Sequence, residues 1–149
     1  MSDIGNIGST SASVSKRFIL VVDDEVRIAD TLALILSSRG YASRAAYDVV
    51  EALAVCRERI PDLLITDVVM PNMNGIELAI AVRRDFSSCK VLLFSGQAAT
   101  AEMLQEASSH GYRFELLAKP VHPAELLDKV AELIGAPGQT VRTSPARVF

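Results

Sequence analysis

The sequence has 149 residues, of which 50% are hydrophobic and 22% are charged, and its net charge at pH 7 is -3. This length and apolar content fit one folded domain and exclude global disorder. The mild acidity disfavours a protein that clamps nucleic acid, because binding to the phosphate backbone depends on excess Lys and Arg.

The two ends of the sequence differ in composition from the middle. Residues 1–15 are rich in Ser, Gly and Thr with a single charge, and they predict a flexible N-terminal arm. Residues 135–149 are similar but carry two arginines, and they predict a flexible C-terminal tail. The periodic part between them, residues 16–134, is the predicted domain.

The sequence also indicates a cytoplasmic protein. No apolar run approaches the roughly 18 residues that span a bilayer, and the first fifteen residues lack the Lys, Arg and apolar block of a secretory signal. Cys56 and Cys89 are too few for a disulfide framework. We expect both thiols to be reduced and buried.

Short aliphatic runs alternate with segments of helical periodicity along the domain. The predicted strands are residues 18–22, 41–45, 63–66, 91–94 and 114–118, of which 41–45 is the weakest. Runs that are apolar on both faces are typical of parallel strands buried between helices. The apolar faces of the five predicted helices are Ile28, Leu32, Ile35 and Leu36; Val49, Leu53, Cys56 and Ile60; Leu78, Ala79 and Val82; Met103, Leu104 and Ala107; and Leu126, Leu127, Val130, Leu133 and Ile134.

Five strand–helix repeats predict the α/β class, with an open, doubly wound, five-stranded parallel sheet. In such sheets, binding and catalytic groups lie beyond the carboxyl ends of the strands. Polar residues follow four of the predicted strands at this edge: Asp23, Asp24 and Glu25, then Asp67, then Ser95, then Lys119.

These residue types point to phosphoryl chemistry. Carboxylates that share a partly dry cleft repel each other unless a cation joins them, and an all-oxygen ligand set suits Mg²⁺. Lys119 adds a positive charge that can neutralise phosphoryl oxygens while Asp67 attacks in line. Each residue also has an ordinary explanation, such as a helix cap for Asp24 and Glu25 or a solvated charge for Lys119. The site explains all four strand ends at once, so we favour it.

The motifs around these residues resemble those of the receiver domain of bacterial response regulators. They are ILVVDDE at 19–25, DVVMPNMNG at 67–75, SG at 95–96 and KP at 119–120. The resemblance covers roughly residues 16–134. It implies a flavodoxin-like (βα)5 fold with strand order 2-1-3-4-5.

The resemblance also implies roles for the residues at the strand ends. Asp67 matches the aspartate that takes a phosphoryl group from a histidine kinase or a histidine phosphotransfer protein. Asp23, Asp24, Asp67 and the backbone carbonyl of Val69 match the Mg²⁺ site, in which Asp23 orients metal-bound water. An apolar Val69 cannot position an attacking water, so we expect slow to moderate hydrolysis of the acyl phosphate.

Ser95 and Lys119 match the remaining two positions of the family's site. Ser95 corresponds to the hydroxyl that moves toward the acyl phosphate, and Lys119 to the lysine that pairs with the phosphoryl oxygens. The Lys119–Pro120 bond is cis in similar proteins. Many receivers have Tyr or Phe three residues before the lysine, whereas this sequence has Leu116, which leaves the coupling between hydroxyl and aromatic open.

The predicted function is that of a stand-alone phosphoacceptor that signals by protein contact, without direct contact to nucleic acid or membrane. It is not a turnover enzyme and catalyses only its own phosphorylation and dephosphorylation. The alternative is a degenerate receiver that binds proteins independently of phosphorylation. An aspartyl phosphatase is disfavoured because Val69 occupies the place of its second Asp, and a flavodoxin-like cofactor binder because acids follow the first strand.

Two predicted helices, 49–56 and 76–82, carry more apolar residues than one core-facing stripe requires. A partner surface or a weak homodimer would explain them, and so would a general richness in alanine and valine. In similar proteins the fourth helix, fifth strand and fifth helix form the usual contact face. Here that face contains Arg113, Glu115 and Lys129.

Overall fold

The computed structural model describes residues 16–71, 74–96 and 100–137, in which five strands alternate with five helices. The strands are β1 (Phe18–Val22), β2 (Ala42–Ala46), β3 (Leu63–Asp67), β4 (Lys90–Ser95) and β5 (Glu115–Ala118). The helices are α3 (Val26–Ser38), α4 (Val49–Glu58), α5 (Gly75–Asp85), α6 (Thr100–Ser109) and α7 (Pro123–Ile134).

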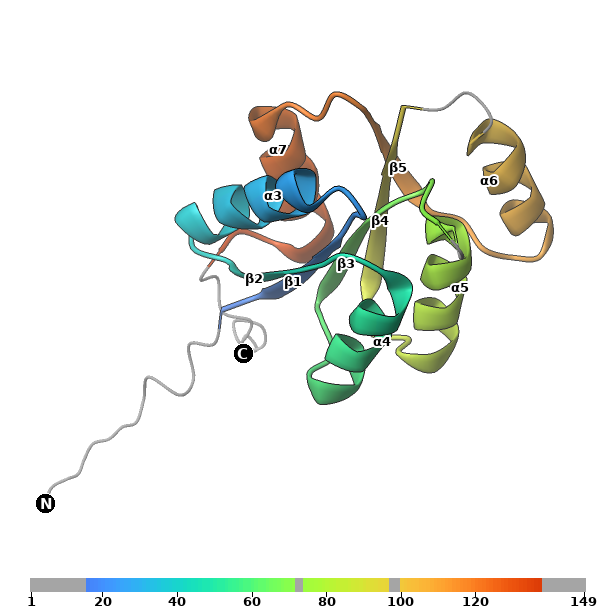
Figure 1. Cartoon of the computed structure of the whole chain (residues 1–149), viewed down its shortest axis with the longest axis horizontal. Coiled ribbons are helices and arrows are strands. Elements are labelled where there is room, and N and C mark those ends of the chain that lie inside the picture. Colours follow the sequence, from blue (N-terminus) through green and yellow to red (C-terminus); the bar gives the residue numbers. More distant parts are fainter. Residues whose placement is uncertain (1–15, 72–73, 97–99, 138–149) are drawn as a thin grey trace, which may run out of the picture.

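The five strands form one parallel sheet in the order β2-β1-β3-β4-β5, as predicted. Figure 1 shows α3 and α7 on one face of the sheet and α4, α5 and α6 on the other. The order reverses between β1 and β3, so the carboxyl ends of these neighbouring strands open onto the crevice where a doubly wound sheet binds ligands.

Side-chain alternation along the central strands divides the core into two layers. In β1, Ile19 and Val21 pack beneath α3 and α7, whereas Leu20 and Val22 pack beneath α4 and α5. All four side chains are fully buried. Burial of each aliphatic side chain contributes about 1.5–3 kcal/mol, which explains why the central strands read as continuous apolar runs.

Two expectations about burial were wrong. Ile60 lies beyond the end of α4 and is exposed, because the helix ends at Glu58 before the predicted apolar face is complete. Strand β5 begins at Glu115, and Leu117 is its one buried residue. As an edge strand it has a neighbour on one side only, and Leu116, which lies opposite Leu93 of β4, stays 40% exposed.

The other expectations about packing are largely confirmed. Cys56 and Cys89 are free and buried, and burial raises the pKa of the Cys89 thiol to about 12. Most apolar residues of 76–82 enter the core, whereas Val50 of α4 is exposed. The Tyr41 hydroxyl donates to the carbonyl of Gly135 and ties the end of α7 to the start of β2.

The predicted arm and most of the predicted tail lie outside the described residues, and their flexibility stays a prediction. None of the helices in the described part of the chain is long and apolar enough to cross a membrane.

Candidate functional site

The polar residues predicted at the strand ends meet at the carboxyl edge of the sheet. Asp23 directly follows β1, Asp67 is the last residue of β3, Ser95 is the last residue of β4, and Lys119 directly follows β5. Because the strands are parallel and in register, residues far apart in the sequence come together here.

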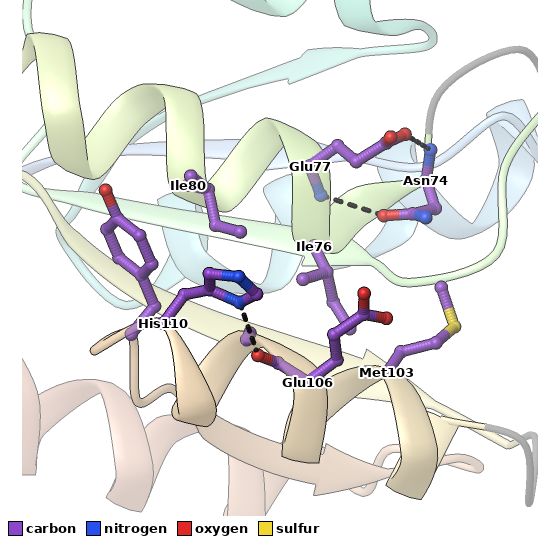
Figure 2. A pocket seen from close by; sticks show the side chains of 9 residues that line it. Asn74, Ile76, Glu77, Ile80, Met103, Glu106 and His110 are labelled. Atoms are coloured by element: carbon purple, nitrogen blue, oxygen red, sulfur yellow. Dashed lines mark hydrogen bonds between the residues drawn. The ribbon is translucent and has the colours of Figure 1, made fainter.

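The backbone directly after Asp67 contacts the start of α5. The Asn74 side chain accepts from the Glu77 amide, and the Glu77 side chain accepts from the Asn74 amide, which forms a complete capping box (Figure 2). The Gly75 amide donates to the carbonyl of Val68 over 2.7 Å. A Cβ atom at Gly75 would lie 1.9 Å from the carbonyl oxygen of Asp67, so this position requires glycine.

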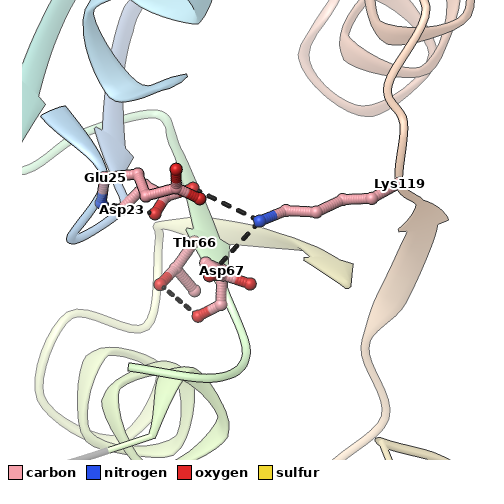
Figure 3. Close-up of polar contacts among 5 residues, drawn as sticks. All are labelled: Asp23, Glu25, Thr66, Asp67 and Lys119. Atoms are coloured by element: carbon pink, nitrogen blue, oxygen red, sulfur yellow. Dashed lines mark hydrogen bonds and ion pairs between the residues drawn. The ribbon is translucent and has the colours of Figure 1, made fainter. Parts of the chain in front are cut away.

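Asp23 is the most deeply buried acidic group of the site, with no exposed surface. Its Oδ1 accepts from the backbone amide of Glu25 over 2.9 Å (Figure 3). Its Oδ2 is buried without a hydrogen bond and lies 3.5 Å from Nζ of Lys119, at ion-pair distance. Burial raises the pKa of Asp23 above its usual value, and the nearby Asp67 carboxylate raises it further.

Asp67 is 7% exposed, and its Oδ2 lies 3.4 Å from Nζ of Lys119. Burial raises the pKa of Asp67, while Lys119 and the backbone amides of Val69 and Val68 lower it in part. The carboxylate therefore carries a cost of desolvation that the lysine and the two amides offset. The Thr66 hydroxyl also donates to the Asp67 carbonyl over 3.0 Å.

Lys119 reaches across the site from the end of β5 and contacts both carboxylates (Figure 3). Its backbone amide donates to the carbonyl of Ser95 over 3.1 Å, which continues the pairing of β4 and β5 by one residue. The Lys119–Pro120 bond is cis, as the family resemblance implied. Nζ also lies 5.0 Å from the ring centroid of Phe94, at cation–π distance.

Asp24 completes the acidic group. One carboxylate oxygen from each of Asp23, Asp24 and Asp67 lies within 4.8 Å of the others, and no other such group occurs among the described residues. Asp24 is exposed, and Glu25, which precedes α3, makes no capping hydrogen bond through its side chain. Helix capping therefore does not account for the two acids that follow Asp23.

The donor set fits a small divalent cation. All three side chains offer oxygen, two of them are buried, and Oδ2 of Asp23, although ion-paired with Lys119, lacks the hydrogen bond that a buried carboxylate oxygen normally has. Hard cations such as Mg²⁺ prefer oxygen ligands. The observed residues thus suit the metal that the sequence predicted.

Ser95 and Val69 lie where the sequence placed them, at the edges of the site. Ser95 is buried at the end of β4, and Val69 follows Asp67 by two residues with its side chain 50% exposed. Sequence reasoning missed Thr66 and the clash that makes Gly75 essential. The Asn-Gly pair before a helical segment was a signal for the latter, but the close approach to Asp67 depends on the fold.

The comparisons with known proteins agree with this geometry. The model of the response regulator receiver domain matches residues 19–131. The DNA-binding response regulator MtrA of Mycolicibacterium paratuberculosis is 31% identical over 112 residues, which cover 75% of this chain and 48% of that protein. The response regulator MprA of Mycobacterium avium is 32% identical over 118 residues, 78% of this chain and 50% of that protein. The chain spans about half the length of these curated relatives.

Solved structures show the same similarity. The chemotaxis protein CheY4 of Vibrio cholerae has a TM-score of 0.72 and 30% identity, over 80% of this chain and 99% of that chain. The response regulator TrrA of Thermotoga maritima, in complex with Mg²⁺ and BeF, has a TM-score of 0.68 and 31% identity, over 78% of this chain and 98% of that chain.

Proposed function

Because the chain belongs to the response regulator receiver domain family of two-component systems, we propose that Asp67 accepts a phosphoryl group from a histidine kinase or a histidine phosphotransfer protein. The observation that carries the proposal is the position of the Lys119 ammonium, 3.4 Å from Asp67 and 3.5 Å from Asp23. This arrangement places one cation beside a buried carboxylate at the crevice of the sheet.

The phosphoryl transfer is a displacement at phosphorus. An Asp67 carboxylate oxygen forms the new bond to phosphorus while the phosphorus–nitrogen bond of phosphohistidine breaks. The electron pair returns to the imidazole, which takes a proton from solvent. Asp67 must be ionised to attack, and Lys119 favours that form although burial opposes it. Lys119 then pairs with the phosphoryl oxygens.

Receiver domains bind Mg²⁺ at their acidic pocket, and Asp23, Asp24, Asp67 and the carbonyl of Val69 are the residues that would hold it here. When bound, the ion neutralises negative charge on the phosphoryl oxygens. Asp23 is held for this task by its hydrogen bond from the Glu25 amide, which orients the carboxylate and leaves Oδ2 without a hydrogen bond, facing Lys119.

Ser95 and Val69 act after the transfer. The Ser95 hydroxyl donates to a phosphoryl oxygen, and the apolar side chain of Val69 leaves no polar group to position water for hydrolysis. An acyl phosphate of slow to moderate hydrolysis follows. We place the reaction in the cytoplasm. The output is a protein contact, because the net charge of -3 disfavours direct contact with nucleic acid.

The test is the intact mass of the full chain after incubation with acetyl phosphate and Mg²⁺. We expect one phosphoryl adduct that disappears with EDTA and in Asp67→Asn. Asp128→Asn is the matched control, because it removes an exposed carboxylate of α7 that has no ion pair among the described residues. No adduct under conditions that label a known receiver would contradict the proposal and favour a phosphorylation-independent binding module.

A further inference from the structure

Two hollows meet at the opposite edge of the sheet, where the strands begin. The first, of about 400 Å³, lies between the end of α5 and the starts of β4 and β5. The second, of about 320 Å³, lies between the starts of β1 and β4 and the end of α7. Both are lined by Ser88, Lys90 and Leu133, so they adjoin each other, and we treat them together as one groove.

Four cations line this groove, namely Arg17, Arg83, Lys90 and Arg113, and we call it the basic groove. In the part of the chain that the structure describes, none of the four forms an ion pair with a carboxylate. The groove therefore carries four cations against two carboxylates, Asp62 and Glu115.

The two carboxylates that line the basic groove are already engaged elsewhere. Asp62 accepts the backbone amide of Phe18 over 2.7 Å. Glu115 lies 3.2 Å from Nζ of Lys129. Neither is within ion-pair distance of a groove cation, although both are close enough to the groove to have served as partners.

Two cations of the groove, Arg83 and Arg17, differ in their contacts. The guanidinium of Arg83 lies 5.4 Å from the ring centroid of Phe114 and donates a long hydrogen bond, 3.5 Å, to the carbonyl of Arg113. Nε of Arg17 is buried without a hydrogen-bond partner.

Helix electrostatics account for only part of this charge. A cation suits the last turn of a helix, which explains Arg83 at the end of α5. Arg17 and Arg113 instead precede strands, and Lys90 begins one, so none of the three lies in the last turn of a helix. The sequence outside the described residues adds little negative charge, since residues 1–15 and 138–149 contain one acidic residue, Asp3.

The chemistry of the groove favours carboxylates over nucleic acid. Phe114 is the aromatic residue of the groove, and its ring already stacks on Tyr112 with centroids 6.4 Å apart and lies beneath Arg83. It is therefore not free to stack on a base. The overall charge of -3 also opposes the long polyanion of a duplex.

We propose that the basic groove binds an acidic segment of a partner protein, whose carboxylates contact Arg17, Lys90 and Arg113. The groove lies at the edge of the sheet opposite Asp67, and we expect this binding to be independent of phosphorylation. The inference goes beyond the proposed phosphoacceptor function and stands without it.

The experiment titrates the full chain with a fluorescein-labelled poly-glutamate peptide at low ionic strength and measures anisotropy. The double variant Lys90→Glu with Arg113→Glu should bind about tenfold more weakly. Arg44→Glu is the control, an exposed cation on the opposite edge strand β2, and should change affinity by no more than about twofold. Amide shifts in NMR spectra should map to Arg17, Ser88 to Lys90 and Arg113, and Asp67→Asn should bind as well as the parent chain.

Several results would overturn the inference. Equal affinities for the double variant and Arg44→Glu, or no amide shifts in the groove, would show that its cations are merely solvated. Tighter binding of duplex DNA than of poly-glutamate would assign the groove to nucleic acid. Self-association that the double variant abolishes would make a second copy the occupant. Loss of peptide binding in Asp67→Asn would refute independence, whereas absence of a phosphoryl adduct bears on the proposed function alone.

Discussion

The two edges of the sheet carry opposite charges and hold them in different ways. At the carboxyl edge, Asp23 and Asp67 are buried around the ammonium of Lys119. At the amino edge, Lys90 and Arg113 are exposed and have no carboxylate partner among the described residues. Buried charges interact at a low effective dielectric constant, whereas exposed charges are screened by water and salt.

The charges at the two edges therefore affect the stability of the fold differently. Burial of two carboxylates lowers the stability of the fold unless a cation compensates them, so the carboxyl edge couples stability to ligand binding. Exposed cations at the amino edge, such as Lys90 and Arg113, lower the free energy of unfolding very little. We expect substitutions at the carboxyl edge to change stability and phosphoryl acceptance together, and substitutions at the amino edge to change partner binding alone.

The largest effect is expected for Gly75→Ala. The new Cβ would lie 1.9 Å from the Asp67 carbonyl oxygen, so the loop must move. We expect a loss of about 2–3 kcal/mol in urea denaturation, together with loss of the acetyl phosphate adduct. Gly111→Ala is the control, because it has open space but a positive φ of 90°. It should cost about 1 kcal/mol and keep the adduct. Full labelling of Gly75→Ala would contradict this role.

Lys119→Met should have the next largest effect. It leaves Asp23 and Asp67 buried without their shared cation, and we expect a loss of about 1–2 kcal/mol at neutral pH with little or no adduct. The loss should shrink as the pH falls, since the carboxylates become protonated. Lys129→Met removes two surface ion pairs, with Glu115 and Glu132, and should cost much less than Lys119→Met. A pH-independent loss for Lys119→Met would point to packing of the side chain instead of charge.

Asp23→Asn should stabilise the metal-free domain. Burial raises the Asp23 pKa above 3.8, so the folded state holds this proton more tightly than the unfolded state. The parent chain therefore loses stability as pH rises from 3.8 through the folded pKa, and Asn does not titrate. In EDTA we expect a gain of about 1 kcal/mol near neutral pH that vanishes below pH 3.8.

The control for this prediction is Asp24→Asn, which removes the exposed carboxylate of the same group. Melting temperatures in EDTA should rise for Asp23→Asn and stay unchanged for Asp24→Asn. Mg²⁺ should stabilise the parent chain more than either variant. A destabilised Asp23→Asn in EDTA would show that the hydrogen bond to the Glu25 amide outweighs the cost of the buried charge.

The smallest effect is expected at the amino edge. Lys90→Glu should change the free energy of unfolding by less than about 0.5 kcal/mol, because the side chain is exposed and has no ion pair to lose among the described residues. Urea denaturation in low and high salt measures this directly. A loss of more than about 1 kcal/mol would remove the contrast between the two edges.

Much of the fold and of the site could be predicted from the sequence. Aliphatic runs such as 18–22 and 63–66 allowed the central strands to be identified, because such strands are apolar on both faces. The convergence of Asp23, Asp67 and Lys119 could be predicted because the carboxyl ends of parallel strands lie at the same edge of a sheet. The burial of Ile60 and of strand β5 was misjudged, because periodicity does not reveal where a helix stops or which strand lies at an edge.

By itself, the sequence determined the alternation of strands and helices, the acidic residues and lysine at the strand ends, and the family to which they belong. Only the tertiary structure decided that Asp23 is buried with one oxygen lacking a hydrogen bond, that Gly75 touches the Asp67 backbone, and that Arg17, Lys90 and Arg113 line adjoining hollows. Periodicity and motifs are local properties of the chain. Burial and distance arise when distant segments pack, and they set the free energy of each charge.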